Sequence, residues 1–139
     1  MIAIGVTGAL SFHAGAPLLI APFGASSVLL FSVPNSPLSQ PANVVGGHLV
    51  ATGVAIALHM VLPGTWWAAA IAVGAAIALM ALLRLIHPPA GADPLLVFRV
   101  RSELGVPRHA GGHGGAVALV AIAALFHRST GTTYPLKAP

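Results

Sequence analysis

The residues whose types could do chemistry gather around a helix break at His87-Pro88-Pro89. Two consecutive prolines remove two amide donors and push the residue before them out of the α region, so an apolar helix running into His87 must end there. An imidazole changes its charge near about pH 6.5, so a histidine at such a break suits a proton-coupled or anion-attracting site. The alternative is that His87 only caps the free carbonyls at the end of the helix.

Polar residues also mark the expected starts of two short helices. Asp93, after a bend at Gly91, precedes a proline, which is the pattern of an N-cap with proline in the first turn. Ser26 and Ser27 follow Gly24 in a similar pattern, and their hydroxyls either donate to an anion or cap their own helix. Asp93 would repel an anion, so for Asp93 we favour a role at its own helix end. Helix N-termini that face a wet cavity in a bilayer are ready anion sites.

Two residues of the following helix complete the candidate site. Asn43 is a plausible N-cap for a helix over 44–62, and His48, one turn into that helix, could line the same cavity as His87. The candidate substrate-binding residues are Gly24, Ser26, Ser27, Asn43, His48, His87, Pro88, Pro89, Gly91 and Asp93.

Catalysis and bound cofactors are not expected. The chain has two acidic residues, Asp93 and Glu103, and no set of nucleophile, base and orienting residue. The absence of cysteine excludes disulfides and thiolate metal sites. His109 and His113 alone, without a carboxylate or thiol ligand, do not indicate a metal site. We therefore expect no enzymatic activity, no catalytic residue, no metal site and no cofactor.

The composition is that of an integral membrane protein. Hydrophobic residues make up 57% of the chain and charged residues 6%, against about 25% charged in ordinary soluble domains. The length of 139 residues fits one helical domain, residues 1–139, whose partner is the lipid bilayer. The net charge of +4 comes from scattered basic residues that form no stripe, so nucleic acid is not an expected partner.

The hydrophobic pattern predicts an all-α membrane protein with four transmembrane helices. They lie near residues 1–20, 43–62, 66–86 and 110–127.

Two further apolar segments, near 26–33 and 93–100, are too short to span and follow the proline- and glycine-containing breaks, so we interpret them as re-entrant-type segments. Residues 99–115 are rich in arginine, glycine and histidine, which predicts a surface loop, and residues 128–139 form a polar tail.

An internal two-fold repeat emerges when Gly24 is aligned with Gly91. Ser26 then falls on Asp93, and both are N-cap residue types. Repeat 1 covers about 1–62 and repeat 2 about 66–127. Repeats built around broken helices recur in transporters, with the site between the halves. The identical positions are Leu18, Pro22, Gly24, Ala25, Leu29, Phe31 and Val33 against Leu85, Pro89, Gly91, Ala92, Leu96, Phe98 and Val100.

Several motifs in order resemble the HPP family of small integral membrane proteins. The resemblance implies a bundle of four transmembrane helices and a candidate activity, since plant chloroplast members are nitrite transporters while most bacterial members have no assigned substrate. The chain departs from the family at Ala42, where arginine is common, and over 99–115. The motifs are His-Pro-Pro within 85–92, Pro-Phe-Gly-Ala-Ser-Ser within 22–31, residues 36–43, Gly-Gly-His at 46–48 and Tyr-Pro at 134–135.

The functional hypothesis is a transporter or channel for a small inorganic anion, nitrite-like. The alternative is a structural or regulatory membrane module without transport activity. Four helices are few for an enclosed path, so we expect a homo-oligomer. We place the protein in the bacterial inner (plasma) membrane, and the arginines between 84 and 108 predict that this side is cytoplasmic.

Overall fold

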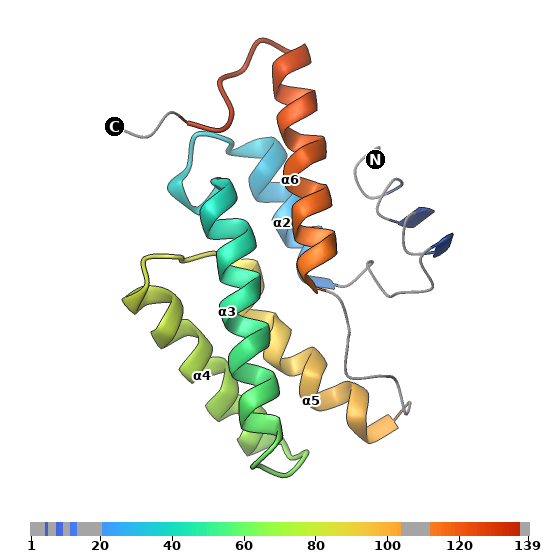
Figure 1. Cartoon of the computed structure of the whole chain (residues 1–139), viewed down its shortest axis with the longest axis vertical. Coiled ribbons are helices and arrows are strands. Elements are labelled where there is room, and N and C mark those ends of the chain that lie inside the picture. The colour runs from blue at the N-terminus through green and yellow to red at the C-terminus, as the bar shows by residue number, and fades with distance from the viewer. Residues whose placement is uncertain (1–4, 6–7, 10–11, 14–20, 104–111, 137–139) are drawn as a thin grey trace.

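The computed structural model describes residues 5, 8–9, 12–13, 21–103 and 112–136, and over these ranges it confirms the predicted all-α class. The predicted helix at 1–20 lies almost entirely outside the described residues. The elements are α2 (Ala21–Ser32), η1 (Pro37–Ser39), α3 (Pro41–His59), α4 (Trp66–Leu82), η2 (Pro88–Ala92), α5 (Asp93–Glu103) and α6 (Gly112–Ser129), where η denotes a short 3-10 helix (Figure 1).

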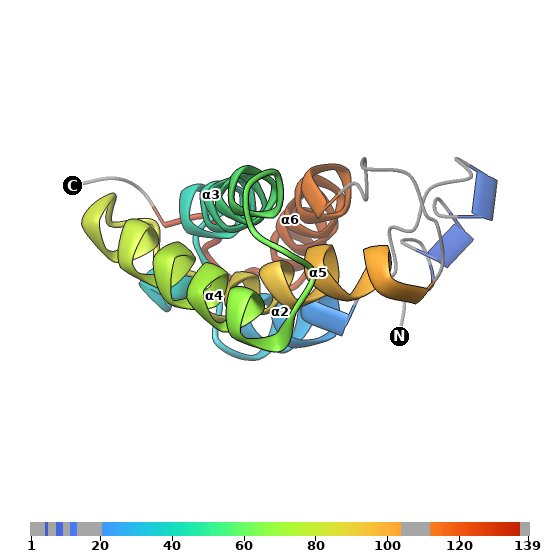
Figure 2. The same cartoon turned by 90° about the horizontal axis from the view of Figure 1, so that it is seen from below.

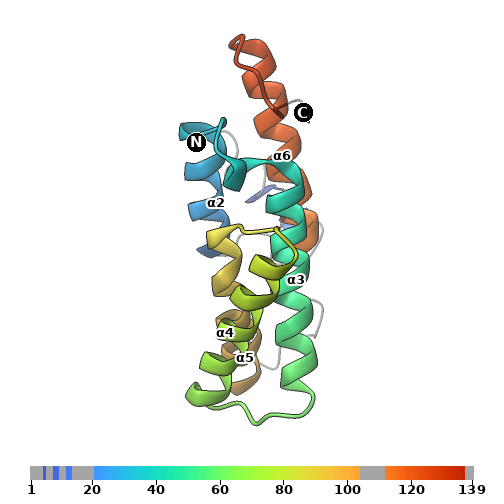
Figure 3. The same ribbon diagram turned by 90° about the vertical axis from the view of Figure 1, so that its left-hand side faces the viewer.

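The described helices form two layers. Helices α3 and α6 lie in one layer, and α2, α4 and α5 lie in the other (Figures 2 and 3). Helix α3 packs against α4, α5 and α6, and it also contacts η1 and η2. A side chain on α3 can therefore meet groups from most of the other elements.

Helix α3 has the length of a membrane span. Its 19 residues extend about 29 Å at 1.5 Å per residue, close to the thickness of a bilayer's hydrocarbon core. Among the described residues it is the one helix that is both long and apolar enough to cross a membrane, whereas the apolar parts of α2, α4 and α6 are shorter. The predicted spans 43–62, 66–86 and 110–127 correspond to α3, α4 and α6. Four transmembrane helices and the internal repeat stay predictions.

Helices α2 and α5 both begin near the middle of the molecule and run in opposite directions from there (Figures 1 and 3). Helix α2 starts at Ala21, earlier than predicted, because proline is tolerated in the first turn. The prediction of Ser26 as an N-cap is therefore wrong, since Ser26 lies inside the helix. Helix α5 continues to Glu103, so the first part of the predicted loop at 99–115 is helical.

Helix α4 ends before the His-Pro-Pro motif. The amide of Leu85 donates to the carbonyl of Met80 (2.9 Å) and that of Arg84 to the carbonyl of Ala81 (3.1 Å), which is the pattern of a Schellman motif. Arg84 takes the left-handed conformation, with φ 57°, that glycine usually supplies. The chain leaves α4 at this point, and the residues that follow carry His87 toward the inside of the bundle.

Small and aromatic residues fill different parts of the core. Buried alanines lie on both α3 and α4, which pack against each other, and such small side chains let helix backbones approach closely. Larger side chains fill the space between α2, α3 and α6. The alanines are Ala51, Ala55, Ala68, Ala72 and Ala76, and the larger side chains are Phe23, Leu30, Val44 and Leu119.

Candidate functional site

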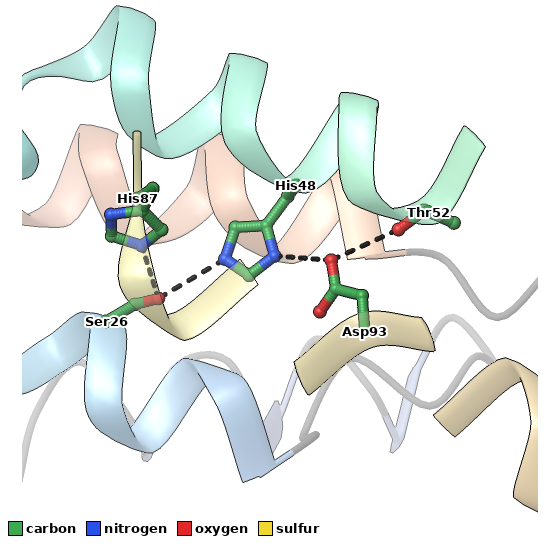
Figure 4. A network of polar contacts seen from close by, with 5 residues as sticks. All are labelled: Ser26, His48, Thr52, His87 and Asp93. Carbon is green, nitrogen blue, oxygen red and sulfur yellow. Dashed lines mark hydrogen bonds and ion pairs between the residues drawn. The ribbon is translucent and has the colours of Figure 1, made fainter. Parts of the chain in front are cut away.

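Five buried polar side chains form one network between the two layers (Figure 4). Ser26 comes from α2, His48 and Thr52 from α3, His87 from the residue before η2, and Asp93 from the start of α5. Ser26, His48 and His87 are fully buried, and Asp93 is 3% exposed. Polar groups buried this deeply need hydrogen-bond partners, and these side chains supply them to one another.

His87 bridges the proline-rich loop and α2. Its Nδ1 lies 2.8 Å from the carbonyl oxygen of Leu38, and its Nε2 lies 2.8 Å from the hydroxyl of Ser26. A carbonyl can only accept, so Nδ1 carries a hydrogen and donates it to Leu38. The orientation of the imidazole is therefore set from both sides.

His48 bridges α2 and α5. Its Nδ1 lies 2.8 Å from Oδ2 of Asp93, which also accepts a hydrogen bond of 3.2 Å from the hydroxyl of Thr52. The Nε2 of His48 lies 3.3 Å from the hydroxyl of Ser26. When His48 is protonated, it forms a buried ion pair with Asp93.

The predicted role of Asp93 as a cap of its own helix is wrong. Its backbone is already helical, with φ −58° and ψ −41°, whereas an N-cap residue has extended backbone. Its side chain crosses to α3 and satisfies His48 and Thr52. The second carboxylate oxygen, Oδ1, is buried and has no hydrogen-bond partner among the described residues.

Residues near the start of α3 fix the position of residues 85–87, which connect α4 to η2. A Cβ atom on Gly47 would lie 2.7 Å from Cβ of His87 and 3.1 Å from the carbonyl oxygen of Leu85, so only glycine allows this approach. The side-chain amide of Asn43 (Nδ2) donates to the backbone carbonyl of Ile86 at 3.0 Å. The prediction of Asn43 as an N-cap is wrong, because α3 already begins at Pro41.

The other candidate residues lie outside the network. Gly24 and Pro88 are exposed. The hydroxyl of Ser27 donates a hydrogen bond of 2.8 Å to the carbonyl of Phe23 in its own helix. Pro89, which is buried, and Gly91, which is partly buried, belong to η2 and shape the backbone leading into α5. The structure thus joins four of the candidates, Ser26, His48, His87 and Asp93, in one network.

Two groups of the network were not found from the sequence. Thr52 lies four residues after His48 on the same face of a helix, and this spacing could have identified it. The carbonyl of Leu38 belongs to the proline-rich loop, and a backbone acceptor leaves no signal in the side chains.

The segment after α6 is more ordered than the predicted polar tail. Tyr134 is 5% exposed, and its hydroxyl donates to the carbonyl of Ser39 at 3.0 Å. Burial raises the pKa of Tyr134 to about 12. The Nε2 of buried His127, near the end of α6, donates to the carbonyl of Leu30 at 2.8 Å. These bonds tie the end of α6 and the following segment to α2 and the loop before α3.

Comparison with known proteins places the chain in a family. Two curated proteins of Dictyostelium discoideum, each named only as a transmembrane protein, are 43% identical over 82 residues and 40% identical over 83 residues. The matches cover 56% and 57% of this chain but only 26% and 29% of the relatives' own lengths. No solved structure matches the chain. The family described as HPP, transmembrane region, matches residues 1–135, and the chain therefore belongs to this family of integral membrane proteins.

Proposed function

We propose that this chain is the membrane core of a transporter or channel for a small inorganic anion, with nitrite as the first candidate. The observation that carries the proposal is the buried network of Ser26, His48, His87 and Asp93 inside an integral membrane protein. Ionisable side chains are costly within a bilayer, and where they occur they mark substrate or ion pathways.

The helix ends around the network favour an anion. Helix α5 begins at Asp93 itself and α2 begins five residues before Ser26, and the N-terminal end of a helix carries about half a positive charge. Discontinuous helices that point their N-termini at an anionic substrate recur in transporters. When His48 is protonated, its ion pair with Asp93 compensates the charge of that carboxylate, which removes the main source of repulsion.

A structural or regulatory module is the second candidate. Nearly every donor and acceptor in the network already has a partner within the chain, and such contacts would also hold α2, α3 and α5 together without transport. Both candidates place exposed apolar side chains of α4 against lipid or a second copy of the chain, and neither includes catalysis. These side chains are Trp66, Ile71, Ile77 and Leu82.

Flux measurements distinguish the two candidates. The purified chain is reconstituted in proteoliposomes, and uptake of nitrite, nitrate, formate and chloride is followed at several pH values. A transporter or channel should admit nitrite faster than protein-free vesicles do, and the rate should vary with pH. If none of the four anions enters faster than in protein-free vesicles, the anion-transport proposal is wrong and the module is favoured.

A further inference from the structure

The two ends of the network determine where its hydrogens lie. At one end, the carbonyl of Leu38 can only accept, so Nδ1 of His87 carries a hydrogen. At the other end, Oδ2 of Asp93 accepts from Thr52 and from Nδ1 of His48. Each imidazole therefore uses its Nδ1 hydrogen outside the pair and turns its Nε2 toward Ser26 (Figure 4).

Ser26 stands between these two Nε2 atoms and has one hydrogen to donate. Its oxygen lies 2.8 Å from Nε2 of His87 and 3.3 Å from Nε2 of His48, so the hydrogen belongs to the shorter contact. The lone pairs of the oxygen then face His48. This contact is a hydrogen bond only when Nε2 of His48 also carries a hydrogen, which makes His48 an imidazolium paired with Asp93. The network therefore has a place for one additional proton.

We propose that Ser26 relays this proton between His48 and His87. The Nε2–H bond of His48 breaks as its proton moves onto the Ser26 oxygen, and the original hydroxyl proton moves to Nε2 of His87. Ser26 keeps one hydrogen, His48 becomes neutral and His87 becomes the imidazolium. No other bond changes. The relay deepens the proposed function, on which it rests, by naming the proton as the ion that moves with the anion.

Apart from Asp93, the described side chains around the two histidines supply no charged partner for the relay. The ring of Phe23 on α2 meets the ring of His48 edge-on, with centroids 5.2 Å apart. Helix α4 contains no ionisable residue. Of the described ionisable side chains of α6, His127 donates to a carbonyl of α2 and Arg128 is exposed. Among the described side chains, the proton is therefore balanced by one carboxylate.

Asp93 also offers an open acceptor beside the relay. Its Oδ1 is buried and has no partner among the described residues, although a carboxylate oxygen is a strong acceptor. A hydroxyl donor that enters from outside the network, from water or from the protonated form of the anion, would find an open acceptor here. Nδ1 of His48 already donates its hydrogen to Oδ2 of the same carboxylate, so a proton bound at Oδ1 would neutralise Asp93 and weaken its hold on the imidazolium.

Nitrogen NMR of the full chain in detergent micelles, labelled at its histidine side chains, tests the relay without any substrate. His48→Gln and His87→Gln assign the signals. At neutral pH we expect both ring nitrogens of His48 to be protonated, and His87 to be neutral with its hydrogen on Nδ1. A neutral His48, or a His87 with its hydrogen on Nε2, would overturn the proposal.

Variants of Ser26 test the transfer itself in proteoliposomes that contain a pH-sensitive dye. Ser26→Ala should reduce proton movement during nitrite uptake at least tenfold. Ser26→Thr, which keeps the hydroxyl, should retain more proton movement than Ser26→Ala, and Ser27→Ala, whose hydroxyl lies outside the network, should show no such loss. Wild-type proton movement in Ser26→Ala would refute the relay. If the NMR result is as expected but the wild-type chain moves no nitrite, the placement of the hydrogens stands and the choice of anion is wrong.

Discussion

Replacing Gly47 with alanine should disturb the network through packing alone. The new Cβ atom would lie 2.7 Å from Cβ of His87, and ordinary carbon contacts begin at about 3.5 Å, so His87 must retreat by roughly 0.8 Å. The imidazole cannot approach Ser26 or Leu38 more closely, because both bonds are already 2.8 Å long. A shift of this size therefore breaks at least one of the two hydrogen bonds.

The free energy of unfolding should fall by about 1–3 kcal/mol in Gly47→Ala. Overpacking costs about 1–3 kcal/mol and a lost hydrogen bond about 1 kcal/mol, while the higher helix propensity of alanine returns about 1 kcal/mol. Gly53→Ala is a matched control in the same helix, because nothing lies within 4 Å of its added Cβ. This control should be neutral or up to roughly 1 kcal/mol more stable.

Both variants are unfolded with a denaturing detergent, and circular dichroism monitors the loss of helix. The two unfolding curves give the difference in stability. Gly47→Ala should unfold at a clearly lower fraction of denaturing detergent than Gly53→Ala. Equal stability of the two variants would show that the close contact between α3 and His87 is absent, and the geometry of the network would then be wrong.

Further predictions concern single side chains. Ser26→Ala should lower the free energy of unfolding by about 1–3 kcal/mol, because two buried imidazole nitrogens lose their partner, and an unfolding curve identical to that of Ser27→Ala would contradict this. Arg84→Gly should raise it by roughly 0.5–1 kcal/mol, since glycine adopts φ 57° without strain; a loss of stability would argue against the left-handed turn. Tyr134, whose pKa burial raises from 10.0 to about 12, should contribute stability below pH 10 that disappears as the pH approaches 12. The chain has a single tyrosine, so phenolate absorbance reports on Tyr134 alone. A titration midpoint near pH 10 would contradict its burial.

The sequence located the break and the short helix after it because proline acts locally. Two prolines after His87 exclude a continuous helix wherever the rest of the chain lies. The exact end of α4 was missed, since Arg84 takes a conformation that favours glycine and carries no sequence signal for it. The start of α2 differs from the prediction because Pro22 marks a helix start here: proline fits the first turn of a helix as well as a break.

The partners within the site depend on tertiary packing and could not be predicted from spacing. His48 and Asp93 are 45 positions apart, and Ser26 and His87 are 61 positions apart. Local rules assigned Ser26 and Asp93 to their own helix ends because serine and aspartate are common N-caps. In the structure both side chains instead contact His48, from opposite sides of its ring. Burial in an apolar bundle overrides the local preference, since the imidazole needs partners that only other elements can supply.

If the buried network carries transport, nitrite flux should depend on His48, and His48→Gln measures this dependence. His59→Gln is the matched control, because His59 lies on the same helix and its ring nitrogens make no hydrogen bond among the described residues. Both variants are first shown by size-exclusion chromatography and circular dichroism to be folded. His48→Gln should lose nitrite flux and its pH dependence, while His59→Gln should keep both. A folded His48→Gln that transports nitrite at the wild-type rate at every pH would contradict the claim.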